Sequence, residues 1–195
     1  MSPRSNLPKA TVVQTAAELL NIEGLEALSL GRLADKLDIR TPSLYNHIDG
    51  LPGLTRELSV LNARKLAERL SEAAIGQSGP GLVMSVMWAY RAYIRENTGL
   101  YMATLRVSGA QDEVNPELEK EEAHSLKVGM AVMASFGLDG EEAIHAVRGL
   151  RSLVHGFATL EVSGGFGMPL DLDESFARLV ELFIDGLQHH KTDGQ

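Results

Sequence analysis

The 195-residue chain is predicted to have an all-α fold. Apolar residues recur at the i, i+3, i+4 and i+7 spacing of one helical face through most of its length. Glycine, proline and helix-capping residues separate these periodic segments. No segment shows the strict apolar and polar alternation of a half-buried strand. These observations favour packed helices in one large or two small domains.

Composition narrows the possible classes of protein. The chain has no cysteine, so disulfides and thiolate chemistry are excluded and structural zinc is disfavoured. No stretch approaches the roughly 18 apolar residues of a membrane-spanning helix, and the N-terminus lacks the apolar core of a signal peptide. We therefore expect a cytoplasmic protein without a cofactor, a metal ion or a membrane partner.

The net charge of −8 is unevenly distributed. Residues 1–70 hold nine Lys or Arg against eight Asp or Glu, whereas residues 71–195 hold nine against eighteen. The N-terminal part is therefore basic only relative to the rest. Binding of a polyanion there would depend on a few local contacts rather than on a strong field.

The first helix is predicted to begin at Pro8 and to end at Gly24, a residue suited to a left-handed C-cap. Its buried face comprises Val12, Val13, Ala16, Leu19 and Leu20. We expect the segment that follows to pack against this face, and Leu25 and Leu28 to fill the corner between the two.

Residues 28–48 are predicted to form two short helices with a tight turn between them. Ser29 is a candidate N-cap of the first helix. The buried face of that helix comprises Leu30, Leu33, Ala34 and Leu37. Asp38 tolerates a left-handed turn. Thr41 can cap the second helix, and Pro42 fits its first position because the φ of proline is already helical.

The second helix has a polar outer surface. Leu44 and Ile48 form an inward i, i+4 pair. The residues left on or near the outside are Arg40, Thr41, Ser43, Tyr45 and His47. Hydroxyls, an imidazole and a guanidinium near a helix N-terminus suit phosphate binding and the major groove of DNA. The alternative is an ordinary helical corner with a solvated face.

This segment resembles the helix-turn-helix of the TetR family of bacterial repressors. The family signature Leu-Tyr-x-His appears here as Leu44-Tyr45-Asn46-His47, and the similarity extends over residues 33–37 and 42–48. The resemblance implies an N-terminal three-helix helix-turn-helix domain. It also implies a C-terminal helical bundle for dimerisation and ligand binding.

The resemblance makes double-stranded DNA the expected partner and predicts roles for individual side chains. The side chains expected to face base edges are Thr41, Pro42, Ser43 and Tyr45. Those expected to hold the DNA backbone are Ser29, Arg32, Tyr45 and His47. Arg40 is expected to reach either a guanine or a phosphate.

A turn is expected at residues 49–53, followed by a connecting helix over residues 54–75. In the family this fourth helix ties the DNA-binding domain to the body, and its N-terminal amides meet a phosphate. The family often has a lysine four residues after the histidine, where this chain has Leu51. The resemblance therefore implies that one phosphate contact is missing, which leaves base reading unaffected.

The glycine-rich residues 76–81 form the clearest break in the chain. The predicted domains are accordingly residues 1–53, 54–75 and 76–195. Further helices are expected over 82–96, 100–107, 116–136, from Asp139 onward and from Asp173 onward.

The last two helices are strongly apolar, more so than one bundle interior needs, which argues for self-association. Residues 150–187 look like the WHG-type C-terminal domain of some TetR regulators, although Leu150 and Arg151 stand where its tryptophan is expected. In the family, the last two helices form a four-helix dimer interface. A homodimer is therefore expected through about residues 141–164 and 173–188, with two recognition helices roughly 34 to 36 Å apart on a near-palindromic operator.

The family also implies a small-molecule effector, which we expect to be apolar or aromatic. The side chains suited to such a cavity are Trp88, Tyr93, Tyr101, Met102, Met130, Met133 and Phe136. The candidate polar anchors are Arg106, His124 and His155. For any one of these residues, core packing is the alternative.

Two other functions stay open at this point. An enzyme is not expected, because the chain lacks the His-Glu-x-x-His, Gly-x-Ser-x-Gly and phosphate-loop motifs. Glu141, Glu142 and His145 share a helical spacing that suits a metal, but exposed first-turn residues of this kind usually form a solvated face. The other alternative is a helix-turn-helix protein that is controlled by a protein partner and not by a small ligand.

Overall fold

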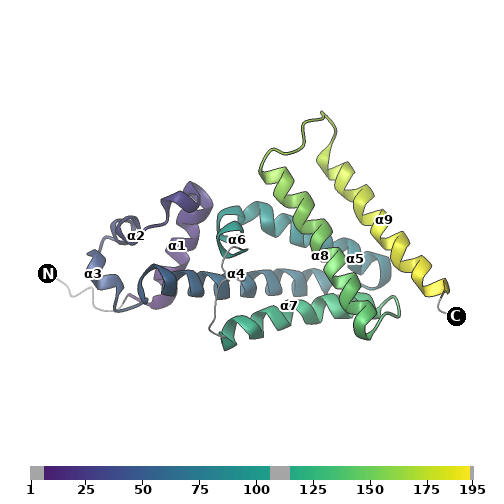
Figure 1. Ribbon diagram of the computed structural model, residues 1–195, viewed down its shortest axis with the longest axis horizontal. Helices are drawn as coiled ribbons and strands as arrows, with labels where there is room; N and C mark the ends of the chain where they lie inside the picture. Colours follow the sequence, from purple (N-terminus) through teal and green to yellow (C-terminus); the bar gives the residue numbers. More distant parts are fainter. Residues whose placement is uncertain (1–6, 106–114, 194–195) are drawn as a thin grey trace. The chain divides into compact units, whose positions relative to one another are not determined.

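Helices form all the regular structure of residues 7–105 and 115–193, the parts of the chain that the computed structural model describes, and no strand occurs in these ranges. The predicted all-α fold is confirmed. The elements are α1 (Lys9–Glu23), the 3-10 turn η1 (Leu25–Ala27), α2 (Leu30–Lys36), α3 (Thr41–Leu44), α4 (Gly50–Ala74), α5 (Gly79–Glu96), α6 (Thr98–Leu105), α7 (Pro116–Ala134), α8 (Gly140–Val162) and α9 (Leu172–Asp193) (Figure 1).

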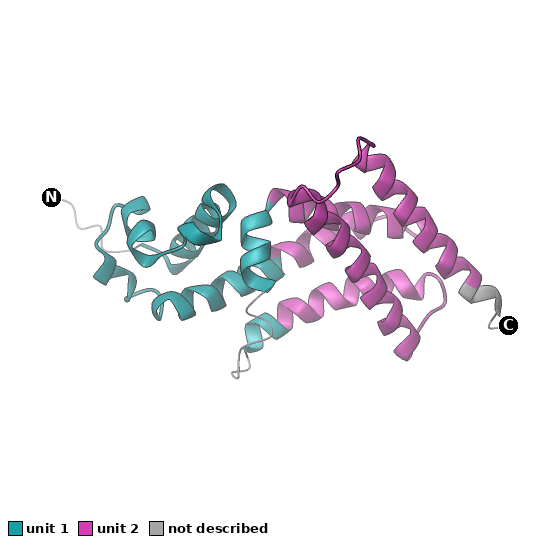
Figure 2. Cartoon of the chain, turned by 45° about the horizontal axis from the view of Figure 1, so that its top comes forward, with its two compact units in different colours: residues 1–64, 97–119 teal, residues 65–96, 120–195 magenta. Residues whose placement is uncertain are grey.

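The chain divides into two compact units, each built from two separate stretches (Figure 2). Unit 1 holds Met1–Arg64 and Asn97–Glu119, and unit 2 holds Lys65–Glu96 and Lys120–Gln195. The division falls inside α4 and α7, so both helices contribute to both units. The sequence-based domains 1–53, 54–75 and 76–195 stay a prediction.

Unit 1 has an apolar core to which α6 contributes, although α6 is distant in sequence from the other core helices. The buried members of this core are Val12, Val13, Ala16, Ala17, Leu20, Leu33, Ala34, Leu44, Ile48, Leu54, Leu58, Leu100 and Ala103. The Leu100 N–H of α6 donates a hydrogen bond to Asn21 Oδ1 of α1 at 2.9 Å. This bond satisfies one of the N–H groups that a helix start leaves unpaired, and it ties α6 to α1.

Several helix boundaries differ from the sequence-based expectation. Helix α5 begins at Gly79, inside the predicted break at residues 76–81, α6 begins at Thr98, and α7 ends at Ala134. The N-cap of α3 is Arg40, which has no side-chain capping bond, so Thr41 is the first helical residue and not the cap. Helix α4 begins at Gly50, and residues 51–53 form its first turn where a separate turn was expected. Pro52 is compatible with this position because the first N–H groups of a helix have no intrahelical acceptor.

In unit 2, α5 packs against both α8 and α9, and α8 and α9 also contact one another. Buried positions recur at four-residue spacing along α8, at Leu150, Val154 and Ala158, and along α9, at Phe176, Val180 and Ile184, and Ala143 and Leu187 are also buried. This spacing gives each helix the single apolar stripe that packing requires. Among the described residues, no helix combines the length and the apolar character needed to cross a membrane.

Candidate nucleic-acid interface

The corner between α2 and α3 is fixed by capping and backbone geometry. Ser29 is the N-cap of α2, as expected, and its hydroxyl oxygen accepts a hydrogen bond from the Arg32 N–H at 3.3 Å. Asp38 adopts a left-handed φ of 52°. The Ile39 N–H then donates to the Ala34 carbonyl at 3.0 Å. Together these contacts set the direction in which α3 leaves α2.

The outward face of α3 and its flanks is polar, as its sequence predicts. Leu44 and Ile48 are buried in the core of unit 1, which confirms the inward pair. The exposed side chains are Arg40, Pro42 and Tyr45, and the half-buried ones are Thr41, Ser43 and His47. Tyr45 is 60% exposed, a high value for an aromatic residue beside a core. A large aromatic side chain held in solvent next to hydroxyls suits contact with another molecule.

The two guanidinium groups predicted to contact DNA differ in their partners. Arg32 forms an ion pair with Glu23, at the end of α1. Arg40 has no ion-pair partner within residues 7–105 and 115–193. A paired guanidinium must share its carboxylate, or give it up, before it can hold a phosphate. Arg40 is therefore available to an anion at a lower cost than Arg32.

A cleft of about 270 Å³ lies beside α3. Its lining residues are Lys9, Tyr45, Asn46, His47, Ile48, Asp49, Gly53, Arg56 and Glu57. Lys9 and Glu57 form an ion pair within this lining, with Nζ 2.5 Å from Oε1. A second cleft of about 310 Å³ is lined by Leu19, Glu23, Arg32, Asp35 and Lys36. The sequence singled out Tyr45 and His47 but missed Lys9 and Arg56, which follow no local motif.

Residues 83–183 match the family model described as the tetracyclin repressor-like, C-terminal domain. The chain is also 34% identical over 187 residues to the uncharacterized HTH-type transcriptional regulator YobS of Bacillus subtilis (strain 168), with 96% of each chain covered. The chain belongs to the TetR family. This TetR-family chain is therefore a DNA-binding transcriptional regulator and not an enzyme.

Two further comparisons, one with a relative and one with a solved structure, also show similarity over most of the chain. The uncharacterized HTH-type transcriptional regulator Rv0681 of Mycobacterium tuberculosis is 30% identical over 190 residues, covering 97% of this chain and 86% of the relative. The crystal structure of a TetR variant from Acinetobacter baumannii AYE in complex with minocycline gives a TM-score of 0.70 at 20% identity, covering 95% of this chain and 99% of that one. The likeness to this crystal structure shows that the fold is shared.

The residues predicted for an effector cavity of the TetR-family chain fall on both units. Tyr101 and Met102 lie on α6 in unit 1. The members in unit 2 are Trp88, Tyr93, His124, Met130, Met133, Phe136 and His155. Three of the set, Tyr93, Tyr101 and Met133, are at most 3% exposed and pack in the interior. Arg106 lies outside the described residues.

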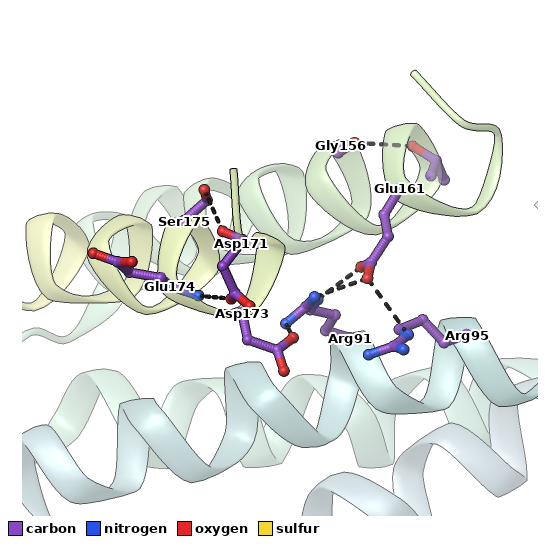
Figure 3. Close-up of polar contacts among 9 residues, drawn as sticks. Arg91, Arg95, Gly156, Glu161, Asp171, Asp173, Glu174 and Ser175 are labelled. Atoms are coloured by element: carbon purple, nitrogen blue, oxygen red, sulfur yellow. Dashed lines mark hydrogen bonds and ion pairs between the residues drawn. The ribbon is translucent and has the colours of Figure 1, made fainter. Parts of the chain in front are cut away.

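Arg91 of α5 was missed by the sequence analysis. Its side chain is 1% exposed, yet it carries a full charge. Its Nε and Nη2 donate to the two carboxylate oxygens of Glu161 on α8, at 2.7 and 2.8 Å (Figure 3). Its Nη1 lies 2.8 Å from Oδ1 of Asp173 on α9. Arg91 thus connects α5 with α8 and α9 of unit 2 through two carboxylates.

Three aromatic rings surround the same guanidinium. Its central carbon lies 5.1 Å from the ring centroid of Trp88, 5.2 Å from that of Phe157 and 4.8 Å from that of Phe176. These distances are within the range of cation–π attraction. Trp88, predicted as an effector contact, also packs edge-on against Phe176 at 5.1 Å. The structure therefore brings Trp88 together with core aromatic residues around a buried cation.

Arg91 and His155 are among the titratable groups of unit 2 that have perturbed pKa values. Burial alone would lower the pKa of Arg91, but hydrogen bonds and charge from Glu161 and Asp173 raise it above its ordinary value. Burial, followed by the charge of Arg151, lowers the pKa of His155. His155 is therefore biased toward the neutral imidazole, which can both donate and accept a hydrogen bond.

Proposed function

We propose that this chain is a homodimeric repressor that binds a near-palindromic operator and leaves it when a small molecule binds in the C-terminal part. The observation that carries the proposal is the outward face of α3. There, Tyr45 is 60% exposed while its neighbour Leu44 is fully buried. An α3 of four residues is too short to be stable or selective by itself. The ability of α3 to bind a specific DNA sequence must therefore depend on the unit 1 core that holds the helix in place and on a second copy of the chain.

The second copy would bind through α8 and α9. Large apolar side chains remain exposed on both helices, with Ile144 at 39%, Leu160 at 50% and Leu182 at 70%. Exposed apolar surface of this kind favours a self-complementary interface in a two-fold dimer. The proposed interface comprises about residues 141–164 and 173–188. The dimer would set two α3 helices about one turn of B-DNA apart.

The proposed effector is an apolar or aromatic molecule. The TetR variant from Acinetobacter baumannii AYE, which shares the fold, is in complex with minocycline, a small molecule. In this chain Trp88, Met130 and His155 are half-buried, so each can be reached by a ligand that displaces little of the core. A ligand that binds more tightly to a dimer whose α3 helices are too far apart or too close for the operator would lower operator affinity. The largest possible decrease equals the ratio of the ligand's affinities for the two dimer states.

Selection of bound sequences from random duplex DNA tests the proposal. We expect a near-palindrome bound by two copies of the chain, as measured by analytical ultracentrifugation of the complex. A screen of aromatic small molecules against the selected duplex should then find compounds that release it. Binding of a single copy to an asymmetric sequence would contradict the dimer. Release by a protein partner but by no compound would contradict small-molecule control.

Substitutions on α3 should separate backbone contacts from base contacts. Tyr45→Phe and His47→Ala each remove a hydrogen-bonding group expected to face the DNA backbone, so both should weaken binding to all sequences alike. Ser43→Ala should instead change the preferred base at one position of each half-site, by about 1 kcal/mol or roughly fivefold. Mobility shifts over a set of single-base operator variants measure both effects. Unchanged shifts for Tyr45→Phe and His47→Ala would refute the assignment.

A further inference from the structure

The cations of unit 1 differ in whether a carboxylate already pairs with them. Three are held in ion pairs: Lys9 with Glu57, Arg32 with Glu23 and Arg64 with Glu117. Arg56 has no ion-pair partner in the described ranges 7–105 and 115–193. An unpaired cation can take an incoming anion without first losing an existing partner. Of the cations that line the cleft beside α3, Arg56 is therefore the one best able to bind an incoming anion.

The position of Arg56 on α4 directs it toward α3. Its guanidinium folds back over Gly53, where its Nη2 would lie 3.7 Å from a Cβ atom added to that glycine. The side chain is half-buried and lines the same cleft as Tyr45 and His47. A phenol, an imidazole and a guanidinium thus converge on one opening next to the outward face of α3. All three can donate hydrogen bonds to an oxyanion.

The cleft also contains negative charge, which has to be included in the balance. The Lys9–Glu57 pair is internally neutral. That leaves the carboxylate of Asp49, which lines the cleft and opposes an anion, against Arg56. The cleft lies at the start of α4, where the unpaired N–H groups and the helix dipole add partial positive charge. Arg56 therefore decides whether the cleft attracts or repels a phosphate.

We propose that Arg56 binds a backbone phosphate of operator DNA in this cleft, supplying the positive charge that Leu51 does not. A duplex read by α3 necessarily brings phosphates along both sides of that helix, because the groove is bounded by them. The contact is independent of sequence and raises affinity without changing base preference. This inference rests on the proposed function, since it requires DNA at α3.

The test measures binding of the full chain to a mixed-sequence duplex as a function of salt, by fluorescence anisotropy. Each lost phosphate contact should reduce the slope of log K against log salt by about 0.9, which is about fivefold in affinity near 0.15 M salt. Arg56→Gln should show this loss once per bound copy, so a dimer should lose about thirtyfold. Arg56→Lys should recover most of the slope. Asp49→Asn should act in the opposite direction and tighten binding.

Arg69→Gln is the matched control. Arg69 lies on the same helix and the substitution removes the same charge, but Arg69 pairs with Glu96 in unit 2. If Arg56→Gln matches Arg69→Gln in both slope and affinity while the unaltered chain binds DNA, the inference is wrong and the proposed function stands. Failure of the unaltered chain to bind the duplex at low salt would instead overturn the proposed function. Melting temperatures of the variants show that each is folded.

Discussion

Arg91→Met is expected to lower the free energy of unfolding by about 3 to 5 kcal/mol. Methionine fills much of the same volume but carries no charge. The substitution leaves the carboxylate of Glu161, which is 11% exposed, without its bidentate partner. The three aromatic rings around residue 91 also lose their cation. The loss of the bidentate pair is the larger effect, because the buried Glu161 carboxylate then keeps only Arg95, which is 52% exposed and 3.5 Å away.

Urea denaturation at a fixed protein concentration measures this loss, since the stability of a dimer depends on concentration. The matched control is Arg95→Met, one helical turn further along α5. Arg95 is 52% exposed and lies 3.5 Å from the same Glu161 carboxylate, so its removal should cost less than about 1 kcal/mol. Adding Glu161→Gln to Arg91→Met should restore part of the loss. Equal stability of Arg91→Met and Arg95→Met would show that the buried Arg91–Glu161 pair stabilises the fold no more than the exposed Arg95 does.

The recognition corner could be predicted because its determinants are local. Ser29 caps α2 three residues before its hydrogen-bond donor, and Asp38 supplies the left-handed turn from its own side-chain chemistry. Leu44 and Ile48 face inward because four residues make one helical turn. The position of the cap at Arg40 was missed by one residue, since neighbouring residues compete closely for that position.

The partners of the charged residues could not be predicted, because they depend on contacts between distant segments. Arg91 shares the apolar face of α5 with Met87 and Ile94. A single arginine on such a face signals that a buried partner exists, but not that the partner is Glu161, 70 residues later. The same limit applies to Arg56. Its importance follows from which other cations are already paired, and those pairs exist only in the folded chain.

The packing of α6 in the core of unit 1 could not be predicted from the sequence either. Sequence grouped residues 100–107 with the body because a glycine-rich break precedes them at 76–81. In the structure, Leu100 and Ala103 are members of the core of unit 1. Nothing in the periodicity of α6 distinguishes one apolar neighbour from another. The choice depends on how closely two backbones can approach, which a single glycine controls.

Gly99→Ala is expected to separate α6 from α1 and to destabilise unit 1 by about 1 to 3 kcal/mol or more. A Cβ atom at residue 99 would overlap the carbonyl group of Leu20 and lie 2.8 Å from the backbone N of Asn21. These are backbone atoms of α1, so no side-chain rotation can relieve the overlap. The gain in helix propensity from glycine to alanine, about 1 kcal/mol, offsets only part of the cost. The shift would also stretch the bond between the Leu100 N–H and Asn21 Oδ1.

Thermal unfolding compared with Gly31→Ala gives the matched measurement. Gly31 is in α2 of the same unit and has no atom within 4 Å of an added Cβ, so alanine there should be neutral or slightly stabilising. A melting temperature for Gly99→Ala at or above that of Gly31→Ala would show that α6 does not need its close approach to α1. If the melting temperature of Gly99→Ala falls as expected, the operator affinity of the folded fraction should be measured as well. Since α6 and α3 share one core, a displaced α6 should weaken DNA binding at a residue that touches no DNA.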